Sequence, residues 1–415
     1  MRRAFGSSAA TPPRPPARAP RLFGLVVAFM AFIAQGYPRS PRPAMAFGMA
    51  LGMEGFQEDL ASSRFGDTQT QGPGAYDRLI QTLRAHRDDP RILAPLARAW
   101  AEREFLTPFA RPLLVLAALR YRALADPTHP LTPEALLDAE LPDLNLRFLE
   151  AFADPDLEPI LQTRAIQTNE PGRALAWGLP ALTLGRPSEE LAPHLAFAHR
   201  GFTLIELGAS AGLNLVVDRT AIPYKFGVHQ AMGLDFPAPE RRVGLDRAPI
   251  DLHDDANVRW LTACIWPGQP DRLARFEACR KLWVEPWLGD APAPIVHAHA
   301  LGPDTARALA DAIADAPARP VLVFQTVVRP YLDPATLAAY QAAVWDFLAA
   351  APNRLFATLE PDATPRTTEP MTLTIHMVRG GERLAIDLAH AGYHAAQCTL
   401  VPGGLQRAAE AWRQE

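Results

Sequence analysis

Apolar residues follow a helical period in the first half of the chain. Leu79, Ile80 and Leu83 recur at spacings of three and four positions, and so do the leucines of segment 113–119. This period places apolar side chains on one face of an α-helix. Thr132-Pro133-Glu134 has the order of a helix start, and no clear alternating strand pattern occurs before residue 200. We therefore expect an all-α domain over residues 76–199.

After Gly201 short apolar runs alternate with helical stretches, including a helix from Asp333 to about Ala350. We predict strands at 202–207, 242–246, 294–299, 320–325 and 354–360. This alternation is typical of a mostly parallel, covered sheet. The runs Leu373–Val378 and Arg383–Leu388 predict an antiparallel hairpin. The expected fold class is α/β, with a Rossmann-like, mostly parallel sheet and a C-terminal antiparallel hairpin over residues 200–405.

The first 52 residues predict a disordered or signal-like extension, followed by a linker over residues 53–75. Arginines and prolines precede the apolar run Leu22–Ala34, which is too short to span a bilayer but has the length of a signal-peptide core. Two interpretations stay open. One is a signal peptide over residues 1–46, and the other is a non-native extension with translation starting at Met45, Met49 or Met53.

The composition is ordinary for a soluble globular protein. Of the 415 residues, 48% are apolar and 21% are charged. The net charge of −4 gives no electrostatic reason to expect nucleic acid as a partner. Three widely spaced cysteines argue against a disulfide framework. We expect a cytoplasmic protein with a small-molecule ligand, no nucleic-acid partner and no stable membrane span.

The segment Glu206-Leu-Gly208-Ala-Ser210-Ala-Gly212 is the main candidate for chemistry. It lies between the apolar run 202–207 and Leu213, where a helix can start. Small residues let the backbone approach a ligand closely, and a helix start offers free N–H groups. An acidic residue at the end of the strand can accept hydrogen bonds. Together these features predict a site for a nucleoside cofactor, with Asn214 just past the turn as a further contact.

This segment resembles the acid-x-Gly-x-Gly-x-Gly turn of class I methyltransferases that use S-adenosylmethionine. Glu206, Gly208 and Gly212 match that turn, and Ser210 replaces its middle glycine. The strand that ends at Asp246 resembles the family's second strand, whose final acid binds the ribose hydroxyls. Asp246 follows Gly208 by 38 residues, more than the usual ~20, which requires an insertion at 216–240. The resemblance implies S-adenosylmethionine as cofactor and methyl transfer to a small acceptor.

Two alternative functions remain. Gly208-Ala-Ser210-Ala-Gly212 is also a G-x-S-x-G sequence, the nucleophile elbow of serine hydrolases. Such an enzyme needs a later acid and a later histidine, for which Asp333 or Asp362 and His390 or His394 are available. However, the elbow follows the first clear strand, and no His-Gly-Gly segment precedes it. The other alternative is a non-catalytic binding protein with a Rossmann fold.

Three residues that precede or begin a predicted helix near Pro171 are candidates for the pocket: Asn169, Glu170 and Arg173. One interpretation is structural, with Asn169 as the helix cap and Glu170 complementing the helix dipole. In the other, all three side chains face the cofactor or substrate. Arg173 then binds a carboxylate, such as the one on the methionine moiety of the cofactor.

Two further groups lie near the carboxyl ends of predicted strands, where ligands bind in open α/β sheets. His297 and His299 share one face of a strand and are the candidates for a catalytic base, while the lack of a nearby third ligand argues against a metal site. Gln325, Arg329 and Tyr331 follow another strand. They either line the pocket or belong to a loop packed over the edge of the sheet.

Four segments are similar to the bacterial family DUF2332, over most of residues 75–402. They are Gln167–Arg173, Glu206–Leu215, Gly244–Asp251, and Arg259-Trp260-Leu with Trp266-Pro267. The resemblance implies a Rossmann-like fold with a helical N-terminal part and supplies no assigned activity. Members of this family often carry a histidine where this chain has Gln325.

Overall fold

The computed structural model describes residues 56–57, 60, 75–105, 110–132, 141–167, 169–184, 201–229, 231–265, 267–287, 293–362 and 369–414. The predicted extension over residues 1–52, most of the linker over 53–75 and the helix expected after Thr132 lie outside these residues. No described helix has both the length and the apolar character needed to cross a membrane.

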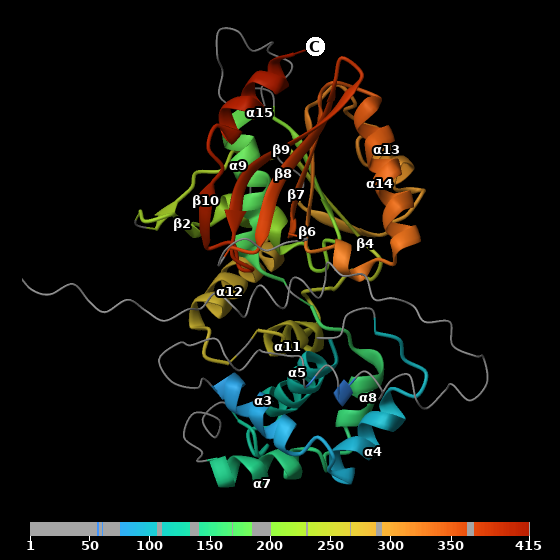
Figure 1. Cartoon of the computed structure of the whole chain (residues 1–415), viewed down its shortest axis with the longest axis vertical. Helices are drawn as coiled ribbons and strands as arrows, with labels where there is room; N and C mark the ends of the chain where they lie inside the picture. Colours follow the sequence, from blue (N-terminus) through green and yellow to red (C-terminus); the bar gives the residue numbers. More distant parts are fainter. Residues whose placement is uncertain are drawn as a thin grey trace, which may run out of the picture.

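The helical part lies below the sheet in Figure 1. It contains α3 (Ala75–Ala85), α4 (Pro90–Ala99), α5 (Ala110–Ala125), α7 (Leu141–Ala151) and α8 (Leu157–Thr163). Leu79, Ile80 and Leu83 of α3 are all buried, as their spacing predicts. The described residues before 200 contain no strand, so the predicted helical character of this region is confirmed.

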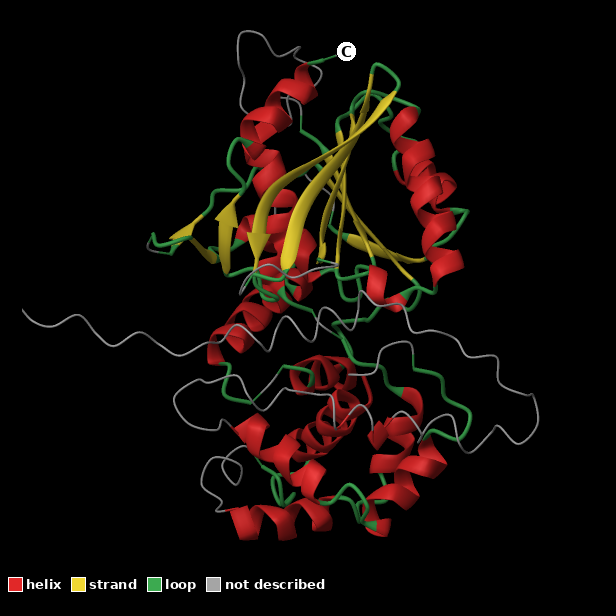
Figure 2. Ribbon diagram, viewed as in Figure 1, coloured by secondary structure: helices red, strands yellow, loops and turns green. Residues whose placement is uncertain are grey.

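The described strands form one sheet in the order β3-β2-β10-β9-β8-β7-β6-β1-β4-β5 (Figure 2). Five parallel strands make up its core: β5 (Ile295–Ala298), β4 (Arg241–Asp246), β1 (Thr203–Leu207), β6 (Val321–Thr326) and β7 (Arg354–Pro361). The hairpin of β8 (Met371–Arg379) and β9 (Glu382–Ala391) continues the sheet in antiparallel fashion. The predicted α/β class, the mostly parallel sheet and the C-terminal hairpin are confirmed.

Three short strands at the far edge were not predicted. β10 (Gln397–Leu400) pairs with β9, and β2 (Pro223–Phe226) pairs in parallel with β10. β3 (Met232–Gly233) is the last strand. β2 and β3 lie within the insertion expected at 216–240. The extra residues between the glycine turn and Asp246 therefore extend the sheet at the edge farthest from β5.

Helices cover both faces of the sheet (Figure 1). On one face, Val321 and Val323 of β6 pack with residues of α13 (Thr305–Ala312) and α14 (Pro334–Ala349). On the other face, Leu322 and Phe324 belong to the larger core that includes α9 (Leu175–Leu184) and α15 (Gly404–Arg413). A strand buried on both faces has a near-continuous apolar run, which is why Val321–Phe324 of β6 show no alternation in the sequence.

Two helices do not follow the expected boundary near residue 200. α9, which precedes β1 in the chain, packs on β6 and β7. α11 (Asp255–Ala263) follows β4 but packs on α5 of the helical part, and α12 (Pro270–Val284) then leads back to the sheet.

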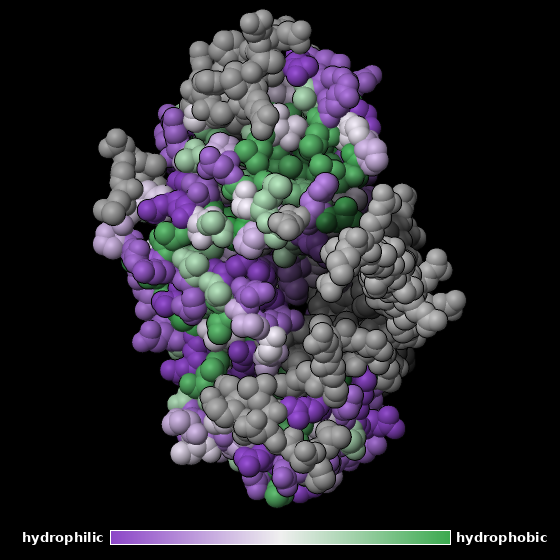
Figure 3. Space-filling model, turned by 90° about the vertical axis from the view of Figure 1, so that its left-hand side faces the viewer, coloured by the Kyte–Doolittle hydropathy of each residue, from purple (hydrophilic) through white to green (hydrophobic). Residues whose placement is uncertain are grey.

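In the face that Figure 3 shows, hydrophilic residues dominate the middle of the molecule, and hydrophobic residues gather above them.

Candidate functional site

A cavity lies where the order of the parallel strands reverses. After β1 the chain adds β4 and β5 on one side and then returns to β6 and β7 on the other. In open α/β sheets, ligands bind outside the carboxyl ends of the strands at such a point. The cavity has a volume of about 820 Å³, within the range of small-molecule sites.

Both parts of the molecule line this cavity. Residues at or after the ends of β1, β4, β5 and β6 form one side, among them Gly208, Asp246, Leu301 and Thr326. Residues of the helical part form the other side, among them Phe105, Leu114 and Ile166. A molecule bound here would contact the edge of the sheet and the helical part at once.

The turn after β1 takes a left-handed backbone conformation at three positions. The φ angles are +72° at Gly208, +52° at Ser210 and +72° at Gly212. A Cβ atom at Gly208 would lie 2.7 Å from Cγ2 of Val328, so the turn and the loop after β6 are in direct contact. Ser210 therefore holds a left-handed conformation that glycine adopts more readily than serine.

Asp246 fixes this turn from the neighbouring strand. Its Oδ2 accepts a hydrogen bond of 2.7 Å from the backbone N–H of Ser210, and its Oδ1 accepts one of 2.8 Å from Ala248. Because β1 and β4 are adjacent and parallel, Asp246 and Glu206 both lie at the edge that bears the cavity. Each carboxylate oxygen can accept a second hydrogen bond, so Asp246 can also bind a ligand.

Glu206 and Asn214 form a buried pair beside the cavity. Nδ2 of Asn214 donates a hydrogen bond of 2.7 Å to Oε1 of Glu206. Oε2 of Glu206 and Oδ1 of Asn214 are buried without a hydrogen-bond partner in the described part of the chain. Burial raises the pKa of Glu206 to about 8, the nearby Asp246 charge adds to this rise, and the Asn214 hydrogen bond opposes it. Oδ1 of Asn214 is thus an unused acceptor, and Oε2 of Glu206 becomes a second one when the carboxyl group loses its proton.

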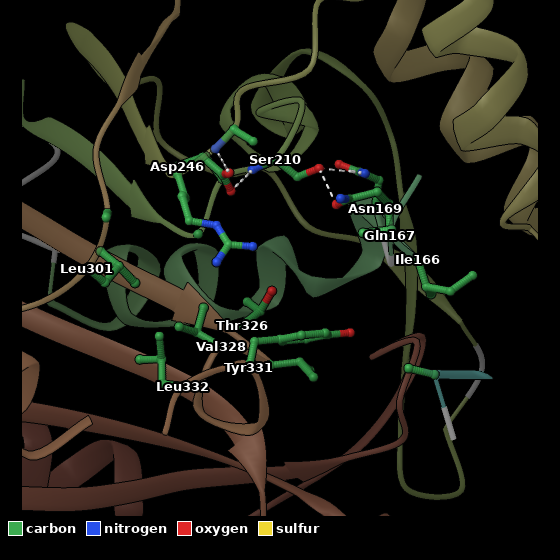
Figure 4. A pocket seen from close by; sticks show the side chains of 18 of the residues that line it. Ile166, Gln167, Asn169, Ser210, Asp246, Leu301, Thr326, Val328, Tyr331 and Leu332 are labelled. Carbon is green, nitrogen blue, oxygen red and sulfur yellow. Dashed lines mark hydrogen bonds between the residues drawn. The ribbon is translucent and has the colours of Figure 1, made fainter. Parts of the chain in front are cut away.

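The hydroxyl group of Ser210 is held by two amide side chains (Figure 4). It donates a hydrogen bond of 2.8 Å to Oε1 of Gln167 and accepts one of 3.0 Å from Nδ2 of Asn169. Neither partner can act as the general base of a serine hydrolase. These bonds connect the turn after β1 to the segment that precedes the short helix η2 (Pro171–Ala174).

Glu170, rather than Asn169, caps this helix. Its Oε1 accepts a hydrogen bond of 3.1 Å from the backbone N–H of Gly172. The Glu170 carboxylate also pairs with Arg272 at 2.7 Å and Arg275 at 2.9 Å, and it lies 3.5 Å from the ring of His394. Asn169 and Arg173 line the cavity, whereas Glu170 does not. Arg173 also donates to the backbone oxygen of Tyr393.

Three candidates from the sequence point away from the cavity or pack elsewhere. Gln325 lies on the α14 side of the sheet, where its Nε2 donates a hydrogen bond of 2.6 Å to Glu360. Arg329 is also absent from the cavity lining, and its backbone N–H donates to Glu360. Gly212 packs against Trp283 and Val296. The expectation that Gln325 and Arg329 line the pocket is thereby corrected, whereas Tyr331 does line it.

The two histidines proposed as a base also lie outside the cavity lining. His297 is exposed at the edge strand β5. Nε2 of His299 lies 3.4 Å from the hydroxyl of Thr305, and its backbone N–H donates to the carbonyl of Asp246. The structure therefore does not bring either imidazole to the residues of the glycine turn.

Sequence reasoning missed the residues that the helical part contributes. Phe105 lines the cavity, and its ring lies 5.0 Å from the guanidinium carbon of Arg103. It occupies a connection between helices, where periodicity gives no signal. Gln167 belongs to the segment Gln167–Arg173 that resembles the DUF2332 family, and its position two residues before the candidate Asn169 could have indicated that it lines the cavity.

Comparisons with known proteins place the chain in a family. No curated protein and no solved structure matches it. A family model described as "Uncharacterized protein conserved in bacteria (DUF2332)" matches residues 61–399. These residues include the turn from Glu206 to Gly212, Asp246 and the segment Gln167–Arg173. The chain therefore belongs to the DUF2332 family.

Proposed function

We propose that this protein binds S-adenosylmethionine in the cavity and transfers its methyl group to a small acceptor molecule. The observation that carries the proposal is the meeting of three features at one switch point: the left-handed turn after β1, Asp246 after β4, and the Glu206–Asn214 pair. S-adenosylmethionine is a nucleoside that carries a sulfonium and an ammonium group. It therefore needs a close backbone approach, an acceptor for its ribose hydroxyls and an acceptor for its ammonium group.

The residues present fit the three parts of this cofactor. Asp246 keeps acceptor capacity for the two ribose hydroxyls. Leu301, Val328 and Leu332 lie together on one side of the cavity, below Asp246 in Figure 4, and offer an apolar surface to a nucleobase. Oδ1 of Asn214 suits the ammonium group, and this cation would favour the ionised form of Glu206, whose Oε2 would then accept a hydrogen bond as well.

When bound, the cofactor supplies a methyl group that is already activated by its sulfonium. The protein's contribution is then to align the acceptor and to exclude water. Phe105, Leu114 and Ile166 form an apolar wall opposite the edge of the sheet, where an acceptor can pack. Tyr331 and Leu332 face Ser210 and Asp246 across the cavity (Figure 4).

The environment of Ser210 supports this proposal over the hydrolase alternative. A nucleophilic serine needs a base that removes its proton. Here the hydroxyl donates its hydrogen bond to the amide oxygen of Gln167, which is not a base. His394, a candidate for that base, lies beside Glu170, and His390 is hydrogen-bonded to Thr372.

Calorimetric titration with S-adenosylmethionine and S-adenosylhomocysteine tests the proposal. We expect the wild type to bind both, and Gly208→Arg to abolish binding because a side chain there would collide with Val328 and displace two lining elements of the cavity. Gly227→Arg is the matched control, since Gly227 also has a positive φ but no atom lies within 4 Å of its Cβ position. Absence of binding by the folded wild type would refute the proposed function.

A further inference from the structure

We propose that Glu360 is a positioning residue that holds the strained loop after β6 against the cavity and so sets the shape of one wall. The inference rests on the proposal that the cavity is the ligand site. Glu360 itself does not line the cavity, but Thr326, Val327, Val328 and Tyr331 do. Its effect on a ligand would therefore be transmitted through this loop.

Glu360 lies near the end of β7 and is 3% exposed. Its Oε1 accepts hydrogen bonds from the backbone N–H of Val328 at 2.8 Å and from Nε2 of Gln325 at 2.6 Å. Its Oε2 accepts a bond of 3.3 Å from the backbone N–H of Arg329. One carboxylate thus binds two consecutive amide groups of the loop, while the hydroxyl of Tyr340 donates to Gln325 and holds that side chain in place.

The loop that Glu360 holds is strained at Val327. The φ angle of Val327 is +54°, and a β-branched side chain is a true outlier in this left-handed region. Such a conformation persists only where the surroundings enforce it. The N–H of Val327 donates to the carbonyl of Leu359 at 3.1 Å, and the next two amide groups are bound by Glu360.

The strained conformation brings Val328 to the glycine turn. Cγ2 of Val328 lies 2.7 Å from the position that a Cβ atom would occupy at Gly208. The loop after β6 therefore closes against the turn that would cradle the cofactor. If the loop relaxed, Val328 would leave this contact and the apolar side of the cavity would open.

The experiment measures S-adenosylhomocysteine affinity and unfolding in urea for Glu360→Gln, Val327→Gly and the double variant. Glu360→Gln replaces one carboxylate oxygen with an NH₂ group, which cannot accept the hydrogen bond of the loop amide that it faces, so we expect about tenfold weaker binding by the folded protein. Asn353→Ala is the matched control: Asn353 is also buried and holds loop carbonyls, but at the amino end of β7. This control should lower the unfolding midpoint and leave the affinity within about twofold of wild type.

Val327→Gly separates positioning from general stability, because glycine adopts the left-handed conformation without strain. We expect Glu360→Gln to lower the unfolding midpoint less in the Val327→Gly background than in the wild type. Equal losses in both backgrounds, or unchanged affinity in folded Glu360→Gln, would overturn the inference. If Glu360→Gln alone does not fold, the double variant should still fold. A double variant that does not fold, when Val327→Gly alone does, contradicts the inference. If the wild type does not bind, the proposed function fails and the unfolding comparison alone decides the role of Glu360.

Discussion

Asn214 donates a hydrogen bond to Oε1 of Glu206, and Oε2 of the same carboxyl group has no hydrogen-bond partner in the described part of the chain. A fully ionised carboxylate is poorly stabilised in such a place, because burial removes water and a single amide donor replaces it. Protonation of Glu206 relieves this, which is why its pKa rises to about 8.

The first prediction concerns stability against pH. In the unfolded chain Glu206 loses its proton near pH 4.5, whereas in the folded protein it keeps the proton until about pH 8. Between these values the folded state binds more protons, so this group lowers the free energy of unfolding by up to about 1.4 kcal/mol per pH unit as pH rises. Glu206→Gln should remove this contribution. Urea unfolding of both proteins from pH 5 to pH 8 measures it, and parallel pH profiles would contradict the prediction.

The second prediction concerns the buried charges around Glu170. Glu170 is 1% exposed and pairs with Arg272 and Arg275, so Glu170→Gln would leave two guanidinium groups without their carboxylate. We expect a loss of about 3–5 kcal/mol in the free energy of unfolding. Glu158→Gln is the control, because the Arg98 side chain that pairs with Glu158 is 59% exposed. Its loss should be at most about 1 kcal/mol, and similar losses for the two variants would refute the prediction.

The third prediction concerns Ser210. Ser210→Ala and Ser210→Gly both remove the hydroxyl that joins Gln167 and Asn169, but only glycine also relieves the positive φ. Ser210→Ala should therefore be less stable than Ser210→Gly by about 1 kcal/mol in urea unfolding.

A fluorophosphonate probe should not label the wild type, with a known serine hydrolase as positive control. Labelling that Ser210→Ala abolishes would instead support the hydrolase function.

The core strands were predictable because burial on both faces leaves a mostly apolar run, such as Val321–Phe324 in β6 and Leu355–Ala357 in β7. β2 and β10 could not be found in this way. Each is four residues long and has one fully buried side chain, Tyr224 in β2 and Cys398 in β10. Such strands depend on pairing with distant segments, since β2 and β10 are about 170 residues apart in the chain.

The same reasoning explains which site residues were predictable. Glu206 and Asp246 end neighbouring parallel strands, so the rule for carboxyl ends places them together. Gln325 also ends a strand, but side chains alternate between faces, and its parity with Val321 and Val323 directs it toward α14. The partners of Glu170 on α12, Arg272 and Arg275, are 102 and 105 residues away in sequence. No local pattern can predict such a pair.

The exchange of α9 and α11 between the two parts has a consequence for how this protein unfolds. A fragment that begins at residue 200 would lose the helix that covers Leu322 and Phe324, and it would leave α11 without α5. Apolar surface would face water in both halves of the cut chain. Heating should therefore melt the helical part and the sheet, which lies above it in Figure 1, in a single cooperative step.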